Sequence, residues 1–96
     1  MSEDAQQVAT LARRALLEAS ATRALVDSGC RFTRLALPHI EERLRVSEDG
    51  DLVYAVDQDG QPRYGRTGRL MTAREVAEEL KATPPFSQCW TGRITR

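Results

Sequence analysis

A chain of 96 residues with 29% charged and only 5% aromatic side chains is one small domain with little material for a large core. We expect oligomerisation or docking on a partner to supply part of the apolar burial, and the alternative is an ordinary small domain with a core of Ala, Leu and Val. The formal net charge is zero but unevenly placed: residues 1–59 carry seven Arg against eleven Asp and Glu (net −4), and residues 60–96 carry seven Arg and Lys against three Glu (net +4). No apolar run approaches the ~20 residues that cross a membrane, and the acidic start MSEDAQQ is unlike a secretory signal. From these two observations we expect a protein of a reducing cytosol.

The first predicted element is a long helix over residues 5–26, a stretch rich in Ala and Leu and free of Gly and Pro. Its apolar stripe recurs every three or four residues and comprises Val8, Leu11, Ala12, Ala15, Leu16, Ala19, Thr22 and Val26. Asp27, Ser28 and Gly29 are predicted to end the helix, with Gly29 in the left-handed conformation. A helix of about 33 Å is long for so small a domain. We therefore expect it to protrude unless a partner or a second copy covers the stripe.

A second, shorter helix is predicted from about Phe32 to Leu44. Pro38 interrupts its hydrogen bonding, so either the helix kinks at Leu37 or a fresh helix begins at Pro38. The apolar period then changes to alternation, which predicts three short strands around 43–46, 52–57 and 61–64. Two turns with Asp-Gly pairs separate these strands, and Pro62 confines the third strand to an edge or to its first residues.

A third helix is predicted from Ala73 to Ala82. Thr72 and Glu75 form the T-x-x-E capping box, with Met71 and Val76 placed as an apolar staple around the helix start. Pro84-Pro85 ends this helix, and the tail that follows has one large apolar pair, Phe86 and Trp90, which either anchors a partner or closes the protein's own small core. The predicted fold class is therefore α+β in a single domain over 1–96, with an N-terminal helix over 1–29 and an α+β module with a three-stranded antiparallel meander over 30–96.

Three segments together form a longer pattern: LALPHIEERLRV from Leu35 to Val46, the DGDLVYAVD strand, and DQDGQPRYGRTGRLMTAREVAEEL from Asp57 to Leu80. The pattern resembles small bacteriophage head-morphogenesis proteins of the capsid-scaffolding type. The resemblance covers roughly Leu35 to Phe86. It implies a non-enzymatic chaperone that binds coat subunits in the cytoplasm of the bacterial host, or transiently in the procapsid, and leaves before or during packaging.

Charge and stripe position, and not the family pattern, indicate where such contacts would lie. The predicted partner-binding residues are Arg63, Arg66, Arg69, Arg74 and Trp90. The predicted self-association residues are Val8, Leu11, Ala15 and Leu16. Weak contacts of this kind become firm when many copies act together, and they remain releasable.

Residues with catalytic or metal-binding potential are few. His39 is the only histidine, with Glu41 and Glu42 behind it, and a structural role is favoured over a His–carboxylate pair. The acidic turns do not match an EF-hand, because Pro62 and Gly68 fall where Gly and Glu are needed. Cys30 and Cys89 are read as small apolar side chains, although sequence alone leaves a pairing open. We therefore predict no enzyme, no metal and no cofactor.

Two other functions are compatible with the same residues. A compact protein without an active site also suits a phage-encoded inhibitor that blocks a host defence protein, such as a CRISPR effector, by occupying its surface. The third candidate is a nucleic-acid-binding regulator that uses the Gly65–Gly68 loop, since G-x-x-G loops with basic neighbours clamp nucleic-acid backbone in KH domains. A KH loop joins two helices directly, whereas this one follows a predicted hairpin.

Overall fold

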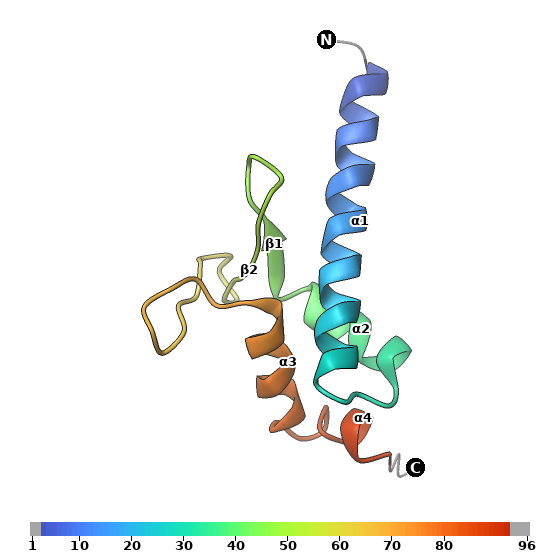
Figure 1. The fold of residues 1–96 in the computed structure, drawn as a ribbon, viewed down its shortest axis with the longest axis vertical. Helices are drawn as coiled ribbons and strands as arrows, with labels where there is room; N and C mark the ends of the chain where they lie inside the picture. Colours follow the sequence, from blue (N-terminus) through green and yellow to red (C-terminus); the bar gives the residue numbers. More distant parts are fainter. Residues whose placement is uncertain (1–2, 93–96) are drawn as a thin grey trace.

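The computed structural model of the chain describes residues 3–92 and mixes helices with a small sheet, which confirms the α+β class (Figure 1). In chain order the elements are α1 (Glu3–Asp27), α2 (Thr33–Glu41), β1 (Leu44–Val46), β2 (Val53–Ala55), α3 (Ala73–Lys81) and α4 (Gln88–Thr91). The helices α2 and α3 pack against the lower half of α1, α4 lies below its lower end against α2 and α3, and the sheet lies beside the middle of α1 (Figure 1). Residues 3–12 of α1 are exposed and extend beyond the other described elements (Figure 1).

The long helix α1 is confirmed, with one or two residues more at each end than predicted. It ends at Asp27, and the turn that follows has the expected left-handed Gly29. With φ at +84°, the Cys30 N–H reaches the Leu25 carbonyl at 2.9 Å and the Gly29 N–H reaches the Val26 carbonyl at 3.0 Å. The radius of gyration is 14.5 Å, against about 12.5 Å for a compact domain of this length. The predicted protrusion of the helix is therefore present in the structure.

The second helix runs through Pro38 as one segment, so a fresh helix beginning at Pro38 is excluded. Proline inside a helix removes one N–H, here the one that would bond the Arg34 carbonyl. The helix ends at Glu41 instead of Leu44, because the chain has already turned into β1 at Leu44.

The sheet has two antiparallel strands, β1 and β2, with Leu44 opposite Ala55 and Val46 opposite Val53. The predicted third strand over 61–64 is wrong. That segment forms only single bridges, between Val56 and Pro62 and between Tyr64 and Leu70. The reason is local: Pro62 has no N–H to donate, and the Arg63 carbonyl turns instead to the N–H of Met71 at 2.8 Å.

The third helix begins as predicted. The Thr72 hydroxyl accepts from the Glu75 N–H at 3.2 Å, and the Glu75 carboxylate accepts from the Thr72 N–H at 3.1 Å. The helix ends one residue before the predicted Ala82. The short helix α4 was not predicted, and it carries Trp90 inward.

The core lies where the inner face of α1 meets α2, α3 and the sheet. Ala21, Ala24 and Leu25 supply that inner face. The other buried apolar side chains are Ala36, Ile40, Leu44, Ala55, Val56, Val76, Ala77, Leu80 and Trp90. Within residues 3–92, no helix is both long enough and apolar enough to cross a membrane.

Candidate partner-binding surfaces

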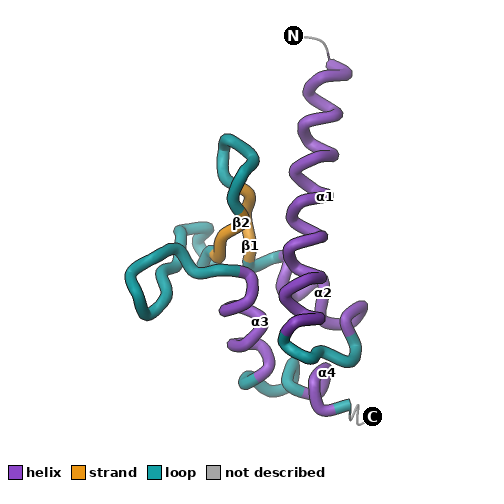
Figure 2. The backbone as a smooth tube through the Cα atoms, in the orientation of Figure 1, coloured by secondary structure: helices purple, strands orange, loops and turns teal. Residues whose placement is uncertain are grey.

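The glycine-punctuated segment from Tyr64 to Leu70, here called the basic hairpin, folds as a tight loop. Tyr64 and Leu70 form an antiparallel bridge, and the Gly65 N–H donates to the Arg69 carbonyl at 2.8 Å. The Gly68 N–H closes the turn on the Gly65 carbonyl at 3.1 Å, with Gly68 at a φ of +79° that favours glycine. Figure 2 shows this loop projecting on the side of the domain away from α1. Its tip is therefore Arg66 and Thr67.

The base of the basic hairpin rests against the start of α3. A Cβ atom added at Gly65 would collide with the carboxylate of Glu75, the same carboxylate that caps the helix at Thr72. The cap therefore uses both the Thr72 and the Glu75 N–H groups internally. For this reason the α3 N-terminus offers less to an anion than an uncapped helix would.

The predicted arginines fall into two classes. Arg63 forms a two-pronged pair with Glu79, one contact being 2.8 Å, and this hydrogen bonding raises the pKa of Arg63 above its ordinary value. Arg74 pairs with Glu78 one turn along α3, at 3.1 Å. Arg66 and Arg69 are exposed, and neither has a carboxylate at ion-pair distance within residues 3–92. Of the four predicted arginines, the two without an ion pair among the described residues therefore both lie on the basic hairpin.

Trp90 lies in the core and is only 7% exposed. Its indole N–H donates to the Ser28 hydroxyl at 2.8 Å, and that hydroxyl donates to the Leu25 carbonyl at 2.9 Å. An aromatic side chain held in this way is not available to a partner, so we leave Trp90 out of the proposed contact surface. The most exposed aromatic residue among residues 3–92 is Tyr64, at 62%, directly beside Gly65 at the hairpin base.

The predicted self-association residues lie on the face of α1 that the domain leaves uncovered. Val8 and Leu11 are 64% and 68% exposed, Ala15 is exposed, and Leu16 is half-buried. Farther along this face, Ala19, Thr22 and Val26 are exposed as well. They were part of the predicted stripe but not of the predicted site, and their heptad spacing is the signal that would have included them.

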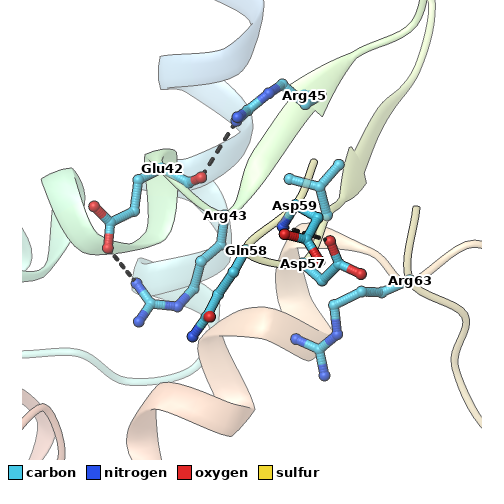
Figure 3. A pocket seen from close by; sticks show the side chains of 8 residues that line it. Glu42, Arg43, Arg45, Asp57, Gln58, Asp59 and Arg63 are labelled. Atoms are coloured by element: carbon cyan, nitrogen blue, oxygen red, sulfur yellow. Dashed lines mark hydrogen bonds and ion pairs between the residues drawn. The ribbon is translucent and has the colours of Figure 1, made fainter. Parts of the chain in front are cut away.

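A hollow of about 720 Å³ lies between the β1 strand and the turn that begins at Asp57 (Figure 3). Apart from the carboxylate of Asp59, its charged groups already have partners in the chain. Arg43 pairs with Glu42 at 2.8 Å, and Arg45 donates to the Glu42 and Leu44 carbonyls. An oxygen of Asp57 accepts from two backbone N–H groups of its own turn, at 2.9 and 3.0 Å. These side chains hold the turn and the α2–β1 junction in place.

The remaining residues considered for chemistry have packing roles. The centre of the His39 ring lies 4.8 Å from that of the Phe86 ring. The Arg43 guanidinium lies over the same Phe86 ring, 5.3 Å from its centroid. Cys30 and Cys89 are free and half-buried, and burial raises the pKa of both thiols. Within residues 3–92, no group of three His, Cys, Asp or Glu side chains is placed to hold a metal ion.

Comparisons with known proteins found no family model, no curated protein and no solved structure that matches the chain. The functional argument therefore rests on the two surfaces described above, the uncovered face of α1 and the basic hairpin.

Proposed function

We propose that this protein is a non-enzymatic assembly factor of a bacteriophage, which binds coat protein in the host cytoplasm and self-associates. The observation that carries the proposal is the separation of two partner-free surfaces on one elongated body. The uncovered face of α1 is apolar, and the basic hairpin projects from the far side of the domain (Figures 1 and 2). The sequence pattern from Leu35 to Phe86 supplies the phage assignment.

The basic hairpin is suited to reversible contact with an acidic segment of a coat subunit. Arg66 and Arg69 are solvated and carry no internal ion pair within the described residues, so they bind an anion without first breaking one. Exposed ion pairs each contribute only about 0.2–1 kcal/mol and weaken with salt. Binding through one hairpin is therefore weak, and several linked copies are needed for a firm but releasable interaction.

The direct test is binding to the coat protein encoded nearest to this protein's own gene, with and without the double change Arg66→Glu and Arg69→Glu. We expect the wild-type protein to sediment with coat protein at low salt, and both the double variant and high salt to abolish this. The matched control is Arg34→Glu, which reverses an exposed charge on α2, away from the basic hairpin. An equal loss of binding in the Arg34→Glu control would remove the coat-binding role. Coat binding that neither the double variant nor high salt weakens would also remove it.

One observation favours a second candidate, a single-stranded nucleic-acid binder. Tyr64 is exposed beside the two open arginines, and an aromatic ring with cations around it is a common platform for an unpaired base. A fluorescent oligonucleotide measures this directly. Tight binding that falls steeply with salt and is lost in both Tyr64→Ala and Arg66→Glu would select this candidate over coat binding.

A further inference from the structure

The uncovered face of α1 follows the spacing of a two-stranded coiled coil. Its apolar positions are separated by four and three residues in strict alternation: Val8, Ala12, Ala15, Ala19, Thr22 and Val26. All six are exposed, and they lie opposite the buried face that includes Leu17, Ala21 and Ala24. In heptad terms they are the a and d positions. The side chains that contact the domain are at b, c and f and, in the last turn, at the g position of Leu25.

The surroundings of this face distinguish it from an ordinary solvated one. A shallow trough runs along the C-terminal half of α1 and is formed by α1 alone. Ala15, Ala19, Thr22 and Val26 form its floor, and Glu18 and Arg23 stand on its two rims. In the protruding half, by contrast, the opposite side is polar, with Gln6, Gln7 and Thr10. The apolar side of the helix is therefore continuous along its length and is not the side that the domain covers.

We propose that two copies of this chain associate through α1 as a parallel, in-register coiled coil. In that arrangement a g residue faces the e residue five positions later in the other helix. Glu18 then faces Arg23 of the second copy, and Leu11 faces Leu16 of the second copy, on both flanks of the seam. The charges are complementary, and the exposed leucine gains an apolar neighbour.

The opposite orientation lacks this complementarity. An antiparallel pair that keeps the apolar residues in layers sets Val8 against Val26 and Ala15 against Ala19. Flanking g positions then face each other, which brings together Glu18 of the two copies. Like charges at close range are unfavourable, so the rim residues favour the parallel form.

The domain does not obstruct such a pair. It packs on the b, c and f side of α1 and covers a flanking position only at Leu25 in the last turn, so most of each domain in a dimer lies on the outside of the seam. The small residues at most a and d positions allow close approach but bury less apolar area than a standard interface of about 800 Å² per partner. We therefore expect a dissociation constant in the micromolar range, about 1–100 µM.

The first experiment measures mass by sedimentation equilibrium over a concentration series. We expect the wild-type protein to pass from monomer to dimer, and Ala15→Glu to raise the dissociation constant at least tenfold. The control Thr10→Glu adds the same charge on the opposite, exposed side of the helix and should leave the dissociation constant unchanged. A wild-type monomer up to about 1 mM, or a dimer that survives Ala15→Glu, would overturn the proposal.

Orientation is tested with the rim charges and with cross-linking. Glu18→Arg and Arg23→Glu should each weaken the dimer about threefold to tenfold, and the double variant should restore it. In a background with Cys30→Ser and Cys89→Ser, Val8→Cys should give a covalent dimer with oxidised glutathione. A cross-link between separate Val8→Cys and Val26→Cys chains, with none between two Val8→Cys chains, would show the antiparallel form and overturn this inference.

The inference extends the self-association part of the proposed function, and the two fail separately. Ala15→Glu leaves Arg66 and Arg69 untouched, so a monomeric variant should still bind coat protein, more weakly because linkage between copies is lost. A dimer without coat binding would retain the coiled coil and remove the assembly role. Coat binding by a protein that never dimerises would do the reverse.

Discussion

The two halves of α1 share a composition but not an environment. From residue 3 to residue 12 every side chain is exposed, whereas Ala21, Ala24 and Leu25 in the second half are buried in the core. The change occurs near Arg13, which donates to the Ser47 carbonyl at 2.7 Å and also to the Glu48 carbonyl, and Arg14, which pairs with Glu41. A helix of ten residues is marginal alone in water. Here the packed half supplies the nucleus, and the exposed half propagates from it.

The largest expected difference between the halves comes from their leucines. Leu25→Ala opens a cavity among fully buried neighbours and should lower the free energy of unfolding by about 2–5 kcal/mol. Leu11→Ala, the same truncation on the exposed half, should change it by less than about 0.5 kcal/mol at concentrations where the protein is monomeric. Urea unfolding followed by circular dichroism measures both. Equal effects would mean that the two halves are packed alike.

A smaller effect is expected from hydroxyl groups in the two halves. Ser28→Ala leaves the buried indole N–H of Trp90 without its acceptor and should cost about 1–3 kcal/mol. Thr10→Ala also removes a side-chain hydrogen bond, to the Gln6 carbonyl, but at an exposed site where water replaces it. The two variants should therefore separate in the same unfolding experiment. A Ser28→Ala protein as stable as the Thr10→Ala protein would show that the indole finds another partner.

The exposed half should also unfold locally. Ala9→Gly lowers helix propensity by about 1 kcal/mol at that site, but the global cost should be smaller because the first turns fray independently of the core. Amide hydrogen exchange should show faster exchange over residues 3–12 than over 20–28, and the substitution should accelerate only the first group. Uniform acceleration of amide exchange along α1 would mean that the whole helix opens as one unit, and that its exposed and packed halves do not differ in local stability.

The least pronounced expected effect involves the thiols at the lower end of the domain. Burial raises the pKa of Cys30 and Cys89 above their ordinary value of 9.0 in the folded state. The unfolded chain therefore loses these protons first, and their contribution to stability is complete below about pH 9 and declines as the pH rises through the folded-state values. Unfolding free energies at about pH 8 and pH 10, compared with those of the Cys30→Ser and Cys89→Ser double variant, isolate this contribution. Identical pH dependence in both proteins would contradict it.

Elements with strong local signals could be predicted from the sequence. Gly29 and the capping box of Thr72 and Glu75 act within a few residues, and both have the expected geometry. The third strand could not be predicted correctly, because Pro62 and the backbone of Met71 together decide whether that segment joins the sheet. The buried face of α1 is also a tertiary outcome. Alanines occur on both the buried face and the exposed stripe, and contacts from distant segments decide which face is covered.

The candidate surfaces divide in the same way. Open charge at Arg66 and Arg69 follows from a glycine-rich loop that local rules describe well. The ion pair that balances the charge of Arg63 depends on Glu79, sixteen residues away on another element. The burial of Trp90 depends on Ser28, which lies 62 residues away. Partners at such separations leave no periodic trace in the sequence.

The placement of Gly65 against Glu75 has a practical consequence for labelling. A side chain at position 65 would push aside the Glu75 carboxylate that caps α3, so we expect a substitution at the base of the basic hairpin to weaken this cap. Between Arg66 and Thr67, both exposed, the chain makes no such contact with the helix. A short epitope or a fluorophore-bearing peptide inserted there would extend outward from a rigid base, and the rest of the domain would keep its structure.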